Sequence, residues 1–154
     1  TQSEQNGGYR YYTRTIIKHC KGYGTNEFNS APQSLLFRTD QHSHYAVLSE
    51  CEKSEYRLMK ELNLEQKTAW LNSIRLDKAF EGRSEFFEKH WSRLNDLGRN
   101  PIIAAEMMVK NMRAFAEEGL TYLETQISAF DKLKPDGSVY SGDEVIDLFR
   151  QRLT

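Results

Sequence analysis

The stretch YRYYTRTIIKHCKGYG, residues 9–24, decides how the chain begins to fold. Up to its cysteine it consists mainly of Tyr, Thr, Ile and basic residues, and aromatic and β-branched side chains favour a strand. Neighbouring side chains of a strand point to opposite faces. One face would then carry Arg10, Tyr12, Arg14, Ile16 and Lys18. The glycines of KGYG predict a turn. We therefore expect a basic β-strand near the start of the chain.

The residues on either side of this strand predict a mostly helical protein. The polar run TQSEQNGG, residues 1–8, is typical of a flexible leader. Residues 9–40 would form a basic β/loop segment, with SLLFRT as a second short strand. From residue 43 to 154, helical apolar spacing and helix-start signals alternate, and the first helix is expected over roughly residues 44–62. Asn63 followed by Gln66, and Ser141 followed by Glu144, are two of the helix-start signals. The fold class predicted is mainly α, a helical bundle with a short N-terminal β-strand element, and 154 residues suit a single domain.

The longest predicted helix covers residues 101–133. It begins at Pro101, because proline at the first helical position loses no hydrogen bond. At 1.5 Å per residue it would be about 50 Å long. Its apolar residues keep to one side throughout, and the small residues Ala105, Ala116 and Gly119 would let another backbone approach closely. A helix of this kind is typical of a bundle brace or a dimer interface.

The charge of the chain is unevenly distributed. The formal net charge is −1, yet residues 1–26 carry four basic residues against one acidic residue, a net of +3. The other 128 residues carry 17 basic and 21 acidic residues, a net of −4. This local excess of positive charge lies where an anionic partner could contact it.

The apolar runs and the two cysteines bear on the compartment. The longest apolar runs, such as residues 102–105, fall far short of the roughly 20 residues of a membrane-spanning helix. No charged segment followed by an apolar segment opens the chain. We therefore expect a cytoplasmic protein without membrane contact. In that compartment Cys20 and Cys51 would be reduced thiols, with a disulfide as the alternative.

Motifs for catalysis or metal binding are missing from the sequence. No GxSxG, HExxH, GxGxxG or phosphate-binding glycine loop occurs, so we expect no enzymatic activity and no cofactor. His42 and His44 would point to one side of a strand and could join Cys20 or Cys51 around zinc. The paired CxxC spacing of structural zinc sites is absent, so the histidines are interpreted as ordinary surface residues and no metal is expected.

Two interpretations of the basic strand compete. In the first it is an edge strand, whose positive charges keep other strands from pairing with it. In the second it pairs with its own copy in a homodimer and enters the major groove of duplex DNA as a two-stranded ribbon. Arg and Lys would then donate to guanine, and Tyr and Thr would contact phosphates. The residues expected to contact DNA are Arg10, Tyr12, Arg14, Lys18 and Lys21.

A family resemblance points toward the second interpretation. The runs TRTIIKHCKGYG, EFN and LLFRTDQ, within residues 9–41, resemble the AcaB-type regulators of conjugative plasmids and integrative elements. The resemblance implies ribbon-helix-helix DNA binding, activation of plasmid conjugation genes, and an intertwined dimer with Arg10, Tyr12, Arg14 and Lys18 facing the DNA. In that fold the helices follow the strand directly, whereas here about 20 residues intervene.

The sequence thus supports two functional hypotheses. The first is a DNA-binding transcriptional regulator that reads duplex DNA through paired N-terminal strands of a homodimer. The second is a non-enzymatic helical adaptor or scaffold, which binds a protein partner along the helix predicted over residues 101–133. Replacing Met108 or Leu120 by Glu would abolish partner binding only under the second hypothesis.

Overall fold

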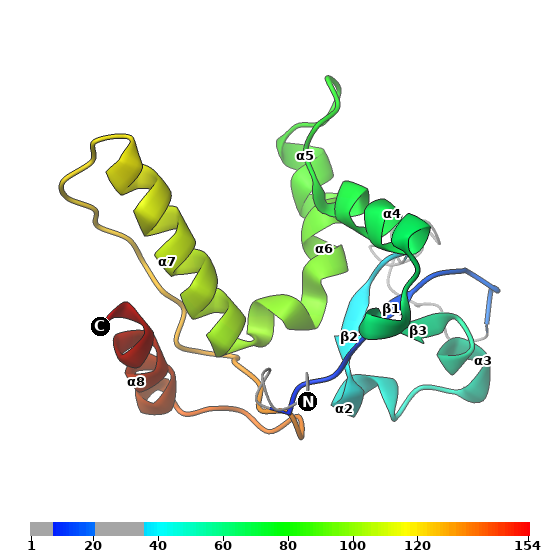
Figure 1. Ribbon diagram of the computed structural model, residues 1–154. Coiled ribbons are helices and arrows are strands. Elements are labelled where there is room, and N and C mark those ends of the chain that lie inside the picture. Colours follow the sequence, from blue (N-terminus) through cyan, green and yellow to red (C-terminus); the bar gives the residue numbers. More distant parts are fainter. Residues whose placement is uncertain (1–7, 21–35) are drawn as a thin grey trace. The chain divides into compact units, whose positions relative to one another are not determined.

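The computed structural model describes residues 8–20 and 36–154 (Figure 1). Over these residues the protein is mixed α/β and 51% helical, with seven helices and a three-stranded antiparallel sheet. The strands are β1 (Tyr11–Arg14), β2 (Thr39–Gln41) and β3 (Tyr56–Leu58). The α-helices are α2 (His42–Tyr45), α3 (Glu50–Lys53), α4 (Leu64–Ile74), α5 (Arg83–Glu85), α6 (Trp91–Leu94), α7 (Pro101–Glu117) and α8 (Gly142–Leu153). The short 3₁₀-helices are η3 (Met59–Glu61) and η5 (Asn95–Arg99), and η4 (Phe86–His90) is a π-helix.

The residues group into two compact units, Thr1–Asp96 and Leu97–Thr154. The first contains the sheet and the short helices, and the second contains α7 and α8. The expected helical majority is therefore correct only in part, because the first unit is organised around a sheet. The expected leader, residues 1–8, lies outside the described residues except for Gly8.

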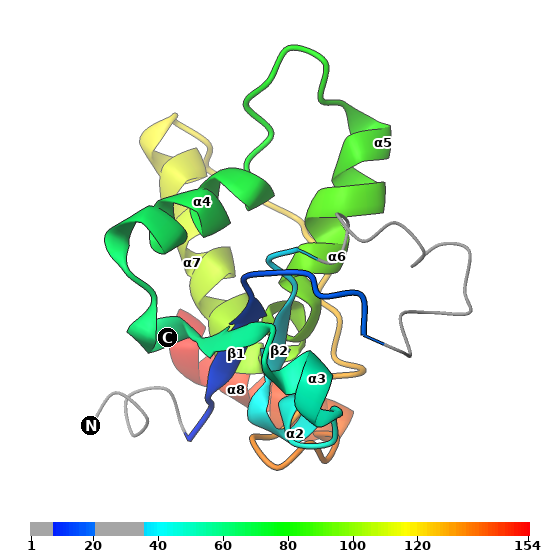
Figure 2. The ribbon, with the colours of Figure 1, turned by 90° about the vertical axis from the view of Figure 1, so that its right-hand side faces the viewer.

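The basic strand β1 is the central strand of the sheet. The strand order is β2-β1-β3, and β1 pairs antiparallel with both neighbours. Figure 2 shows β1 and β2 alongside each other, with α2 and α3 below them. Both backbone edges of β1 are therefore occupied within one chain. This corrects both interpretations of the strand, because β1 is not an edge strand and has no free edge on which a second copy could form a ribbon.

The two faces of β1 carry different side chains, as the alternating pattern predicts. Tyr12 and Arg14 lie on one face, and Thr13 between them lies on the other. Thr13 is paired with Thr39, whose hydroxyl accepts a hydrogen bond of 3.0 Å from the Trp70 indole of α4. α4 therefore contacts the Thr13 face. The predicted alternation is confirmed for β1, where Arg14 is the one basic residue and shares the face of Tyr12.

The helix expected over residues 44–62 is wrong. The chain instead forms α2, α3, β3 and η3 in this region. Ser49 and Glu52 form a capping box at the start of α3. The chain after α3 is extended and pairs with β1 as strand β3. Residues 56–58 form backbone hydrogen bonds with the second edge of β1, and the spacing of apolar residues along the sequence does not show this pairing. The next prediction is confirmed, since Asn63 and Gln66 form a capping box at the start of α4.

The long helix α7 ends at Glu117, well before the predicted residue 133. Gly119 follows with a φ of 93°, and its backbone N–H donates to Ala116 at 3.0 Å. The N–H of Leu120 reaches back to the carbonyl of Phe115, also at 3.0 Å. These two bonds form a Schellman motif, in which a left-handed residue ends a helix. Gly119 is thus a helix terminator and not the close-approach residue that the sequence suggested.

The core of the second unit is small. α8 begins with a capping box between Ser141 and Glu144, as predicted, and packs on the first half of α7 (Figure 1). The buried apolar residues at this contact are Ala105, Val145 and Phe149. Four partly buried residues pack against them, namely Ala104, Met108, Ala129 and Tyr140.

Candidate functional site

Arg14, one of the five residues expected to contact DNA, is inside the protein. Its side chain is 5% exposed, and its Nε lies 2.9 Å from Oε2 of Glu55, which is 0% exposed. The guanidinium carbon also lies 4.9 Å from the centre of the Tyr56 ring. The charge of Arg14 is therefore neutralised by the carboxylate of its own chain. This corrects the expectation that Arg14 faces DNA.

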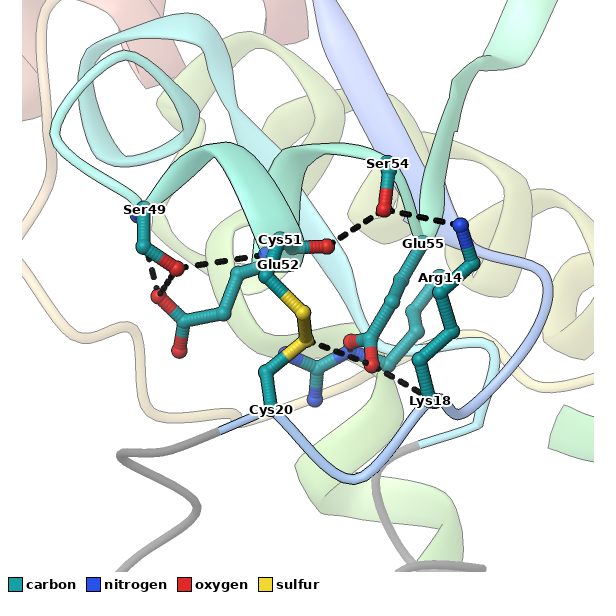
Figure 3. Close-up of a disulfide and its surroundings, with 8 residues drawn as sticks. All are labelled: Arg14, Lys18, Cys20, Ser49, Cys51, Glu52, Ser54 and Glu55. Carbon is teal, nitrogen blue, oxygen red and sulfur yellow. Dashed lines mark hydrogen bonds and ion pairs between the residues drawn. A yellow bond between two sulfur atoms is a disulfide. The ribbon is translucent and has the colours of Figure 1, made fainter.

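Lys18 and Cys20 surround the same carboxylate (Figure 3). The backbone N–H of Lys18 donates to Glu55 Oε1 at 2.8 Å, and the Lys18 ammonium donates to the Ser54 hydroxyl at 3.0 Å. Cys20 Sγ lies 3.5 Å from the same Oε1 and is bonded to Cys51 in a disulfide. The expectation of two reduced thiols is therefore wrong. The distance between these cysteines depends on the sheet, which the sequence alone does not reveal.

A second polar network surrounds Asp40 and includes Tyr56, the residue whose ring the Arg14 guanidinium faces. The Tyr56 hydroxyl donates to Asp40 Oδ2 at 2.6 Å, and Asp40 also accepts from the side chain of Asn95 and lies 3.4 Å from Arg38. Burial raises the pKa of Tyr56 well above its ordinary value, and the negative charge of Asp40 and the hydrogen bond to it act in the same direction. Tyr56 therefore stays protonated at neutral pH and donates to Asp40, which is a structural role.

Arg10 and Tyr12 belong to a cluster at the surface. Arg10 is exposed, and its guanidinium lies 3.3 Å from His42 Nδ1. The Tyr12 hydroxyl lies 3.3 Å from the same nitrogen, and the Tyr12 ring stacks on Tyr45 at 3.8 Å. We call Arg10, Tyr12, His42 and Tyr45 the aromatic cluster. A cation beside half-buried aromatic rings can contact a phosphate or a stacked base.

The histidines considered for zinc are used differently. His42 belongs to the aromatic cluster, and His44 Nδ1 lies 2.7 Å from Oδ2 of the buried Asp96. Within residues 8–20 and 36–154, no three His, Cys, Asp or Glu side chains are grouped so that they could hold a metal ion. Lys21, the fifth residue expected to contact DNA, lies outside the described residues.

Among the residues that the structure describes, a long uninterrupted run of exposed residues with large apolar side chains lies on the second unit. Every residue from 110 to 128 is exposed, which includes the last part of α7 and the segment after it. We call residues 110–128 the arm. Its large apolar side chains are Met112, Phe115, Leu120, Tyr122, Leu123 and Ile127. Figure 1 shows this part of α7 extending beyond α8. The apolar stripe was visible in the sequence, but the lack of any covering element within the unit was not.

An open hollow lies between α7 and α8 in the same unit. Its volume is about 230 Å³, and it is lined by Ile102, Ala105, Leu148, Gln151 and the side chain of Arg152. Arg152 forms an ion pair with Glu106 across the two helices. The hollow is therefore lined by both apolar and polar side chains, and its volume accommodates a single apolar side chain.

Among the residues that the structure describes, every helix is too short or too polar to cross a bilayer.

Similarity to known proteins adds nothing to these observations. No protein-family model matches the chain, and no curated protein or solved structure is significantly similar to it. The resemblance to the AcaB-type regulators therefore stays an expectation.

Proposed function

We propose that this chain is a non-enzymatic adaptor or scaffold that associates with another polypeptide through the arm. The observation that carries the proposal is the uninterrupted exposure of residues 110–128 with their six large apolar side chains. Soluble proteins seldom expose contiguous apolar patches without an interaction to cover them. Fully burying one side chain of this size gains about 1.5–3 kcal/mol, so covering several at once can drive association.

The partner that the arm fits is a second copy of this chain, arranged antiparallel. Lys110 and Arg113 lie in the middle of the sequence of α7, whereas Glu117 and Glu118 lie at its C-terminal end. A two-fold axis near the middle of this stretch would place the basic residues of each copy opposite the acidic residues of the other. Ala116 would permit close approach of the helices. The small core of this unit leaves the arm available for such a contact.

Sedimentation equilibrium over a wide range of protein concentration tests the proposal. The wild-type protein is expected to form a dimer, and Met112→Glu or Phe115→Glu to shift it to monomer, because both side chains are exposed and neither packs on the core. Met108 is unsuitable as a test residue, since it packs against the core of the unit. Val47→Glu, an exposed apolar position in the other unit, is the matched control and should leave the dimer intact.

Charge reversal tests the antiparallel arrangement. Lys110→Glu should weaken the dimer, and adding Glu118→Lys to the same chain should restore it, because the opposed pairs are re-formed with inverted sign. A wild-type protein that stays monomeric at every concentration would overturn the proposal. A dimer that Met112→Glu leaves unchanged would place the contact elsewhere and overturn it as well.

We propose DNA binding as a second function, supported by the aromatic cluster and by the exposure of Arg10 and Lys18. The protein would contact duplex DNA with these exposed residues and not with paired strands, since β1 is internal to the sheet. Gel shifts with plasmid-derived and random DNA at ~50 mM salt test it. The logarithm of affinity should fall by about 0.9 per neutralised phosphate for each logarithmic unit of salt. Arg10→Ala with Lys18→Ala should lower binding and Val47→Glu should not, while absence of wild-type binding would refute it.

A further inference from the structure

The two sulfur atoms of the disulfide have different surroundings (Figure 3). Cys20 is 6% exposed, and its Sγ lies 3.5 Å from a carboxylate oxygen of Glu55. Cys51 is an exposed residue of the short helix α3. Glu55 is fully buried, so its carboxylate and the neighbouring Cys20 lie in the interior of the protein. The residue at one end of the disulfide is therefore exposed to solvent and the residue at the other end is covered.

Thiol–disulfide exchange depends on this difference. The reaction begins when a thiolate attacks one sulfur of the bond, and the rate depends on which sulfur can be reached. Attack on Cys20 would require an anionic nucleophile to enter a covered position beside the carboxylate of Glu55. Attack on Cys51 requires no such entry. Access therefore selects Cys51.

We infer that Cys51 is a site of reversible modification by small-molecule thiols such as glutathione. The thiolate attacks Cys51 Sγ, a new bond forms between the two sulfurs, and the Cys20–Cys51 bond breaks. Its electron pair leaves with Cys20 Sγ, which takes a proton from water. A second thiolate can then displace Cys51 as a free thiol, and the two small thiols are released joined as their own disulfide.

The segment that carries Cys20 is held in place without the disulfide, which makes the exchange reversible. The backbone N–H of Thr15 donates to the Glu55 carbonyl at 2.8 Å, and that of Lys18 donates to the Glu55 carboxylate at 2.8 Å. The ion pair with Arg14 fixes that carboxylate in turn. Cys20 thus stays close to the modified Cys51, attacks the mixed disulfide and expels the small thiol. The balance between reduced and oxidised small thiols sets the fraction of protein in each form.

Mass spectrometry of the thiol-treated full chain tests the inference. The protein is equilibrated with graded ratios of reduced to oxidised glutathione, blocked at neutral pH with excess N-ethylmaleimide, which alkylates all remaining free thiols, and digested with trypsin. The expected result is glutathione on the peptide that contains Cys51, and N-ethylmaleimide on the peptide that contains Cys20. Glutathione on the Cys20 peptide to an equal or greater extent would overturn the inference.

Two single-cysteine variants decide the case in which the mixed disulfide does not accumulate. Cys20→Ser leaves Cys51 as the free thiol, and Cys51→Ser leaves Cys20, so both variants lack the same disulfide and serve as matched controls. Glutathione disulfide should modify the Cys20→Ser variant at least about tenfold faster, because reactivity of a thiol follows its access. Equal rates, or faster reaction of the Cys51→Ser variant, would overturn the inference. Neither result bears on the arm, so the test is independent of the proposed function.

Discussion

Replacing Arg14 by Met should destabilise the first unit strongly, although the sequence places this residue among surface cations. Arg14 is 5% exposed and its partner Glu55 is fully buried, with 2.9 Å between the charged atoms. Removing one partner of a buried ion pair costs about 3–5 kcal/mol, because the other charge stays buried without compensation. Since small domains are stable by about 5–15 kcal/mol, this is a large share of the total.

Urea unfolding followed by circular dichroism, without reductant so that the disulfide stays intact, measures the effect. Arg10→Met is the matched control, since Arg10 is exposed, and surface changes of this kind stay within about 0.5 kcal/mol. The double variant Arg14→Met with Glu55→Met should recover much of the loss, because it removes both charges and leaves no unpaired ion inside.

The opposite pattern would refute this reasoning. If Arg14→Met lost less than about 1 kcal/mol and the double variant were no more stable than the single one, the ion pair would not be buried as described. Loss of DNA binding by Arg14→Met without loss of stability would return Arg14 to the protein surface and to the original hypothesis of a DNA-facing strand.

Three further predictions concern the disulfide, a buried tyrosine and the end of α7. Cys51→Ser should lower the free energy of unfolding by about 4 kcal/mol, because the bond closes a loop between residues 31 apart, and urea unfolding under oxidising conditions checks this. The raised pKa of Tyr56 means that its contribution to stability is complete below the ordinary tyrosine pKa of 10.0 and is lost as the pH rises above it. Tyr56→Phe should therefore reduce the loss of stability above that pH, as measured by unfolding at several alkaline pH values. Gly119→Ala should cost about 1 kcal/mol in thermal unfolding through its positive φ alone, since no atom lies within 4 Å of the added Cβ, whereas Gly98→Ala, equally unobstructed but without a positive φ, should cost nothing.

Part of the candidate sites could be predicted from the sequence. The alternation of Tyr12, Thr13 and Arg14 correctly placed Tyr12 and Arg14 on one face of a strand and Thr13 on the other. The burial of Arg14 could not be predicted, because Glu55 lies 41 positions away in the sequence and becomes its partner only when β3 pairs with β1. For the same reason the disulfide between Cys20 and Cys51 was only the alternative to reduced thiols. The helical spacing of apolar residues was predicted correctly as far as Glu117, because it is a local property, but the expected continuation of the helix to residue 133 was wrong.

Local signals determined the starts of helices, the alternation within β1 and the apolar face of α7, because each depends on side chains only a few residues apart. Asn63 and Ser141 start helices in the structure as their capping partners predict. The tertiary structure alone decided that β1 is central, that Arg14 is neutralised and that Cys20 meets Cys51. These outcomes depend on which distant segments pair with β1 and satisfy its backbone hydrogen-bonding groups. The choice among segments far apart in the sequence leaves no local pattern.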